Sequence, residues 1–154
     1  MKNIAFTFIL GITLLSCNSK NRIYSENKEL SPQMEWLKKD SRTFNVPIEN
    51  TDNTYDLSLS FRYVEGFPYE ALKVNIIETS PSGKETSKEY DLKVREESGE
   101  YIGEVALDIW DSEHLIEANK KYSEKGKYTY KIEHVMPKDP VQMVMEIGVI
   151  LDKK

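Results

Sequence analysis

Tyr55-Asp-Leu57-Ser-Leu59-Ser-Phe61-Arg-Tyr63 is the stretch of this sequence that decides the fold. Apolar or aromatic side chains occupy every odd position, and polar side chains occupy every even position. Successive side chains of a strand point to opposite faces of the sheet, so this alternation predicts a β-strand with one buried face. The rest of the domain must supply partners for that face.

Other short apolar segments, two of which (Leu72–Ile76 and Tyr128–Met136) show the same alternation, are predicted as further strands. They are Leu72–Ile76, Thr86–Val94, Tyr101–Ile109, Tyr128–Met136 and Val144–Leu151, preceded by a segment that carries Phe44. Turn-forming residues separate several of them, such as Pro81 and Gly83, which suit a type I turn. We therefore predict an all-β fold, a single antiparallel β-sandwich of about seven to eight strands, with a closed barrel as the rival architecture.

The alternation changes over Asp111–Tyr122. Ser112 is a residue type that caps helices, and Leu115, Ile116 and Ala118 have the spacing of a short apolar helix face. We predict one short helix here, inserted between two strands.

The N-terminal residues have the pattern of a bacterial lipoprotein signal. Lys2 precedes the apolar run Ile4–Leu15, and Leu14-Leu15-Ser16-Cys17 ends it with a small residue before a cysteine. The run has about a dozen residues, whereas a membrane-spanning helix needs roughly 20. We predict a signal peptide over residues 1–16, a lipidated flexible tether over residues 17–33, and the β-sandwich domain over residues 34–154 of the 154-residue chain.

Cys17 is the residue whose chemistry is clearest. As the only cysteine it would carry a diacylglyceryl thioether and an N-acyl chain such as palmitate, and more than one acyl chain holds a protein stably on a membrane. Acylation leaves no thiol for a disulfide or a metal site. Asn18 is not the aspartate that retains many lipoproteins in the inner membrane, so we expect the outer membrane, with the domain facing the periplasm.

Charge and missing motifs exclude several classes of function. The formal net charge of −5 disfavours nucleic-acid binding, which needs clustered lysine and arginine. His114 and His134 have no second ligand at metal-binding spacing, and no P-loop, G-x-S-x-G or G-x-G-x-x-G motif occurs. We therefore expect no metal, no cofactor and no catalysis, and we expect His134 to be a buried, hydrogen-bonded or rim residue of its strand.

Three aromatic residues outside the regular alternation are candidates for an interaction patch. Phe67 and Tyr69 flank a proline in a loop, and Trp110 directly follows the strand predicted over Tyr101–Ile109. Exposed together, such rings would bind a protein partner or stack on a glycan. Tyr55 and the other aromatics of its strand are expected in the core.

The order of these motifs resembles the gliding motility-associated lipoprotein GldH family of Bacteroidetes. After the cysteine come Trp36, Asp40, Phe44 and Asp52-Asn-Thr-Tyr55, then Phe67-Pro-Tyr-Glu-Ala-Leu72 and Pro81-Ser-Gly83, and finally Gly126-Lys-Tyr-Thr-Tyr-Lys-Ile-Glu-His-Val-Met136 and Ile147-Gly-Val149. Tyr101 stands where the family pattern has a tryptophan, Ala71 where it has an asparagine, and Gln142–Val144 lacks an expected glycine.

The resemblance implies a cell-envelope lipoprotein that is needed for gliding and for the linked secretion of surface adhesins. It implies other envelope proteins as partners and no known catalysis. Two alternatives stay open: a glycan-binding or ligand-binding lipoprotein that uses the loop aromatics, and a hydrolase in which a pocket joins His114 or His134 to a carboxylate and a hydroxyl.

Overall fold

The computed structural model describes residues 21–154, which form an all-β domain with no helix. The predicted all-β class and antiparallel pairing are confirmed. The strands are β1 (Arg22–Glu29), β2 (Glu35–Trp36), β3 (Arg42–Ile48), β4 (Tyr55–Val64), β5 (Ala71–Thr79), β6 (Glu85–Lys93), β7 (Glu104–Ala106), β8 (Ile109–Lys120), β9 (Gly126–His134), β10 (Val141–Gln142) and β11 (Val144–Lys153).

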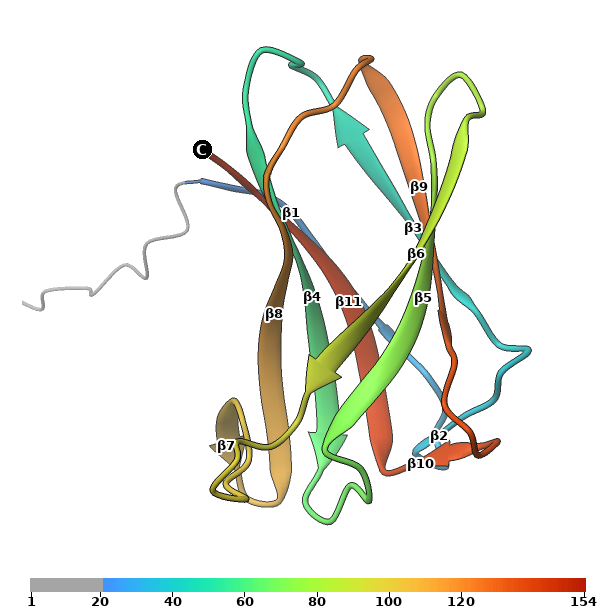
Figure 1. The fold of residues 1–154 in the computed structure, drawn as a ribbon, viewed down its shortest axis with the longest axis vertical. Helices are drawn as coiled ribbons and strands as arrows, with labels where there is room; N and C mark the ends of the chain where they lie inside the picture. The colour runs from blue at the N-terminus through green and yellow to red at the C-terminus, as the bar shows by residue number, and fades with distance from the viewer. Residues whose placement is uncertain (1–20) are drawn as a thin grey trace, which may run out of the picture.

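Two antiparallel sheets make up most of the domain. One has the strand order β1-β11-β4-β8-β7 and the other has the order β3-β9-β5-β6, while β2 and β10 form a short separate pair. The two larger sheets face each other in Figure 1, and buried residues of both belong to one hydrophobic core. The apolar faces of the alternating strands are therefore buried against one another.

β4 is a central strand of the five-stranded sheet. It pairs with β11 on one side and β8 on the other, and its odd-numbered side chains, from Tyr55 to Tyr63, are all buried. This is the buried face that the alternation predicted.

The helix predicted for Asp111–Tyr122 is wrong, because most of these residues belong to β8. Ser112 does not cap a helix. Its buried hydroxyl donates a hydrogen bond of 3.1 Å to the carbonyl oxygen of Phe61 in the neighbouring strand. The strand predicted over Tyr101–Ile109 is also only partly correct, since β7 has three residues and Ile109 already begins β8.

A β-bulge explains the helix-like spacing in β8. Leu57 and Ser58 are adjacent in β4, but their partners Glu117 and Leu115 are two positions apart, so Ile116 is an extra residue. A second register shift follows closer to the end of the strand. Each extra residue moves the apolar positions off a period of two, and the resulting pattern imitates a helix face.

β1 corrects the prediction of a flexible tether over residues 17–33. Arg22–Glu29 pair with β11 along the edge of the five-stranded sheet, so the folded domain begins at Arg22 rather than at residue 34. The segment has no clear alternation because an edge strand with solvated side chains needs few apolar residues. The predicted signal peptide, residues 1–16, and Cys17 lie outside the described residues.

Candidate functional site

The β domain has two ends, which we name from the position of Asn21. The carbonyl oxygen of Asn21 accepts a hydrogen bond of 2.7 Å from the Lys153 backbone N–H, next to the C-terminus at the top of Figure 1. We call this the proximal end. The distal end is opposite, where the β4–β5 loop, the β7–β8 turn and the β2–β10 pair lie (Figure 1). Residues 21–154 contain no helix of the length and apolarity needed to cross a bilayer.

Phe67 closes the core at the distal end. Its side chain has 0% exposure, so the prediction that it belongs to an exposed patch is wrong. Gly66 has a φ of +95°, a conformation that glycine adopts without steric cost, and the Phe67 N–H donates a hydrogen bond of 3.1 Å to the Val64 carbonyl oxygen. This tight turn directs the ring back over the core.

The three predicted aromatic residues lie in one continuous row of packed rings. Phe67 contacts Tyr69 and Tyr63, Tyr63 contacts Tyr101, and Tyr101 contacts Trp110, with ring centroids 5.1–6.1 Å apart. Tyr69 and Trp110 are half-buried against the core. These rings therefore pack against one another and against the core, and they do not form a free flat surface. Phe67 in particular is not available to stack on a glycan.

Arg95 contacts this row of rings and holds it in place. Its guanidinium lies 4.6 Å from the centre of the Tyr101 ring and donates hydrogen bonds to the Phe67 carbonyl oxygen at 3.0 Å and to the Tyr101 hydroxyl at 2.8 Å. The same hydroxyl accepts a hydrogen bond from the Gly66 N–H at 2.7 Å. Burial raises the pKa of the neighbouring Tyr63 to about 12, so this phenol stays protonated at neutral pH.

Exposed apolar side chains gather at the distal end. Among the described residues six large apolar side chains are exposed, and Met34, Val105, Leu107 and Met143 are four of them. Leu107 is 97% exposed, while Met34 and Met143 are 43% and 40% exposed. We call Met34, Leu107 and Met143 the distal ridge.

The distal ridge is also strained. Met34, Leu107 and Met143 have φ values of +56°, +62° and +62°, in the left-handed region that costs a side chain with a Cβ about 1–2 kcal/mol. Leu107 is the first residue of the two-residue turn between β7 and β8, a position that normally takes glycine when φ is positive. Large apolar residues are uncommon there.

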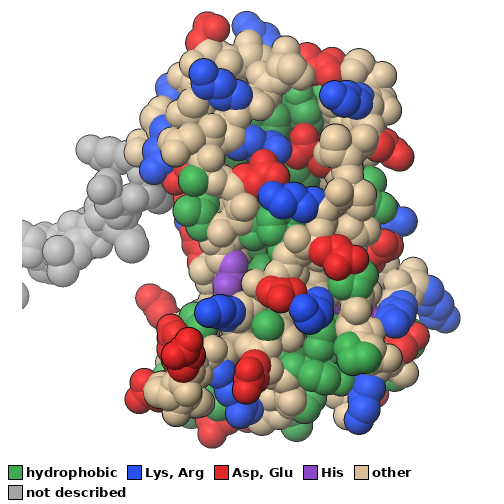
Figure 2. All heavy atoms as spheres, viewed as in Figure 1, with side chains coloured by type: hydrophobic (Ala, Val, Ile, Leu, Met, Phe, Trp, Pro, Cys, Tyr) green, Lys and Arg blue, Asp and Glu red, His purple; other side chains and the backbone are tan. Residues whose placement is uncertain are grey.

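Charge is distributed unevenly between the two ends. The segment Arg95–Asp111, which carries the β7–β8 turn, contains six carboxylates and one guanidinium, and Figure 2 shows acidic side chains gathered at the corner that β7 occupies in Figure 1. The β8–β9 connection at the proximal end, Lys120–Lys127, contains four lysines and one glutamate. The β7–β8 region of the distal end is therefore acidic, and the proximal connection is basic.

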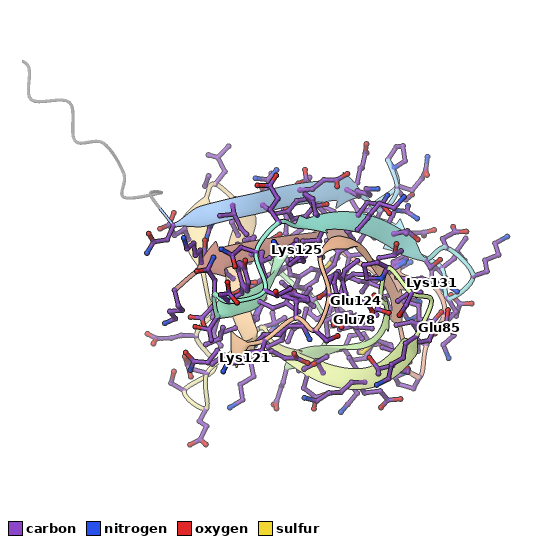
Figure 3. The ribbon with its side chains drawn as sticks, turned by 90° about the horizontal axis from the view of Figure 1, so that it is seen from above. Glu78, Glu85, Lys121, Glu124, Lys125 and Lys131 are labelled. Carbon is purple, nitrogen blue, oxygen red and sulfur yellow. The ribbon has the colours of Figure 1, made fainter. Side chains whose placement is uncertain are left out.

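Charged side chains of both signs lie at the proximal end, where Figure 3 labels Lys121, Lys125 and Glu124 among other charged residues. Beneath them the Lys120 ammonium lies 2.6 Å from Glu117 and 2.8 Å from Glu78. Burial disfavours this charge, but hydrogen bonds to the two carboxylates outweigh burial and raise the pKa of Lys120. This group serves the fold rather than chemistry.

A polar groove of about 440 Å³ crosses the outer face of the five-stranded sheet. Arg62 joins Asp111 at 2.7 Å and Glu146 at 2.9 Å, and Arg22 likewise joins two carboxylates. The guanidinium groups that line the groove are therefore already paired within the chain, and we assign no ligand to it.

The two histidines occupy packed positions. His134 is buried, as predicted, and its ring packs edge-on against Trp36 at 5.3 Å between centroids. His114 lies in β8 rather than at a helix start, with its Nε2 atom 2.9 Å from the Ser112 hydroxyl. Burial lowers the pKa of both histidines. Over residues 21–154 no three histidine, cysteine or acidic side chains meet in a way that would hold a metal ion.

The sequence did not point to the distal ridge or to Arg95. Asp108 is a residue type that favours turns, but the apolar Leu107 beside it fits the strand predicted over Tyr101–Ile109. Met34 and Met143 lie outside every alternating segment. A signal was present only in the charge of Arg95–Asp111, which a count along the chain would have found.

Comparison with known proteins identifies the family that this chain resembles. Residues 22–151 match the family described as GldH lipoprotein. The Gliding motility lipoprotein GldH homolog of Christiangramia forsetii is 31% identical over 150 residues, which cover 96% of this chain and 90% of that protein. The Gliding motility lipoprotein GldH of Flavobacterium johnsoniae is 25% identical over 136 residues, covering 88% of this chain and 82% of that protein.

One solved structure has a weak similarity of shape. It is TmCBM61 in complex with beta-1,4-galactotriose, which is 13% identical, with a TM-score of 0.32 over 88% of this chain and 75% of that chain. A similarity of this size supports no conclusion about binding.

Proposed function

The chain belongs to the GldH lipoprotein family, and from this premise we propose that it is a lipid-anchored component of the gliding motility apparatus and its associated secretion machinery. It acts through contacts between its β domain and other envelope proteins. The observation that carries this proposal is the similarity to two gliding motility lipoproteins over most of the chain.

The anchor in this proposal is Cys17, exposed as the new N-terminus after removal of residues 1–16. The tether is then short, because the folded domain begins at Arg22. The membrane is the outer membrane, with the domain in the periplasm. Lys121, Lys125 and Lys127 support an orientation in which the proximal end faces the bilayer, since lysines near an anionic surface each favour binding by about 1 kcal/mol.

The proposal assigns no catalysis to the domain. His134, one of the two histidines that a hydrolase could use, is buried among core side chains and accepts a hydrogen bond of 3.3 Å from the Met136 N–H at its Nδ1 atom. The other, His114, contacts a serine whose hydroxyl is already donated to a backbone carbonyl. These hydrogen bonds give both histidine side chains a structural role.

Gene deletion and complementation test the proposal. We expect the deletion strain to lose gliding and adhesin secretion, and we expect the full-length gene to restore both. Normal gliding and secretion in the deletion strain would contradict the role in the apparatus.

A Cys17→Ala variant tests the anchor separately. We expect this variant to remain unlipidated and to leave the outer-membrane fraction, because the acyl chains supply most of the membrane affinity. Incorporation of labelled palmitate and fractionation of the envelope measure both outcomes. A lipidated Cys17→Ala protein would show that the anchor lies elsewhere.

A further inference from the structure

Three features coincide at the distal ridge and nowhere else among residues 21–154. Met34, Leu107 and Met143 are large and apolar, each is at least 40% exposed, and each has a positive φ. Asn119 is the one other non-glycine residue described with a positive φ, and it is polar.

Backbone hydrogen bonds connect the three residues across the end of β4. The Glu65 N–H donates to the carbonyl oxygen of Asp108, the second residue of the β7–β8 turn, at 2.7 Å. The Val64 N–H donates to the Met143 carbonyl oxygen at 3.0 Å, and the Val144 N–H donates to the Met34 carbonyl oxygen at 3.3 Å. The ridge is therefore held in place by the sheet and does not depend on a free loop.

The domain gains no packing from Leu107. With 97% of its surface exposed, its side chain contributes almost nothing to the core, and its backbone conformation is one that leucine disfavours. Backbone strain that no packing interaction offsets is characteristic of functional positions. The apolar side chain therefore suits binding rather than folding.

We propose that the distal ridge docks on an envelope protein that presents an apolar pocket flanked by lysine and arginine side chains. The inference rests on the proposed function and names the surface that would serve it. Apolar side chains in the centre of an interface supply affinity, and the acidic residues of Arg95–Asp111 around the β7–β8 turn favour a basic partner surface.

The position of the ridge argues against two other occupants. β11 runs ten residues from Val144 to Lys153, about 33 Å at 3.3 Å per residue, and the chain leads toward Cys17 from the far end of that strand. The ridge thus lies at the end of the domain opposite Asn21, from which the chain leads to the proposed anchor. A second copy of the chain would bring two acidic segments together, and like charges disfavour that pairing.

Site-specific photocrosslinking in gliding cells tests the proposal. The full-length lipoprotein replaces the native gene product and carries p-benzoylphenylalanine at position 107, and a matched protein carries it at position 115. Leu115 is also an exposed leucine, 58% exposed on β8. We expect illumination to link position 107 to one envelope protein at least about tenfold more strongly than position 115, through a peptide that contains basic and apolar residues.

A charge reversal tests the predicted chemistry of the partner. Glu104→Lys combined with Asp108→Lys should lower the position-107 adduct about tenfold, because the reversed charges meet a basic surface. Glu85→Lys combined with Glu89→Lys makes the same change of charge on the exposed strand β6 and should leave the adduct unchanged. Thermal unfolding of both variants confirms that each is folded.

Several results would overturn the proposal. These are equal crosslinking from positions 107 and 115, an adduct with lipid or with a second copy of the chain, a partner peptide without basic residues, and an adduct unchanged by the Glu104 and Asp108 reversals. Loss of gliding on gene deletion together with any of these results would leave the proposed function intact and remove only the ridge. Normal gliding of the deletion strain together with a specific position-107 adduct would contradict the proposed function and leave the distal ridge as a binding surface.

Discussion

Leu107→Asn should make the domain more stable, although it replaces a leucine by a polar residue. Leu107 has a φ of +62° in a two-residue turn, and asparagine adopts this conformation at lower cost than leucine. At 97% exposure the leucine side chain buries almost no apolar area, so nothing offsets the release of strain.

The size of the effect follows from these two quantities. Removing part of a left-handed penalty of about 1–2 kcal/mol raises the free energy of unfolding by about 0.5–1 kcal/mol. For a domain of this size, 1 kcal/mol shifts Tm by about 3–5 °C. We therefore expect Tm to rise by about 2–5 °C.

Leu115→Asn is the matched control, because it makes the same chemical change at another exposed leucine. Leu115 lies within β8, where asparagine is a poorer strand former, so this variant should lose about 0.5–1 kcal/mol. Urea and thermal unfolding of the chain beginning at residue 18 measure both. A Leu107→Asn variant that is less stable than the original chain by more than about 0.5 kcal/mol would refute the reasoning, since it would mean that Leu107 packs.

Three further changes test other parts of the structure. Phe67→Ala should cost about 3–5 kcal/mol, measured by urea unfolding, because it empties the distal end of the core, and a loss below about 1 kcal/mol would mean that the ring is exposed. Gly148→Ala should weaken the β1–β11 pairing, because its methyl group would overlap the Asn27 side-chain oxygen; unchanged hydrogen exchange in β1 would disprove this. Burial lowers the pKa of His134 below its ordinary value near 6.5, with partial opposition from Asp139. The unfolded state then binds a proton that the folded state does not, so the free energy of unfolding should fall below about pH 6.5 by at most about 1.4 kcal/mol per pH unit, and His134→Gln should reduce this slope.

Part of the candidate site could be predicted from the sequence. The sequence predicts Phe67, Tyr69 and Trp110 as candidates because they are aromatic residues in or beside predicted loops, and the structure does bring them into one row of rings. Their exposure could not be predicted, because a loop aromatic is buried or free according to whether the end of a core lies beneath it. The turn at Gly66 decides this for Phe67.

The sequence by itself determined the all-β class of this protein, because the alternation of β4 is a local property in which each side chain is placed by the pleat of its own strand. Features that depend on contacts between distant parts of the chain were decided only by the tertiary structure. The bulge at Ile116 depends on register with β4, and β1 became a strand because β11 offers a free edge. The distal ridge exists because hydrogen bonds from three separate segments hold Leu107 and its neighbours in a conformation that their own residue types disfavour.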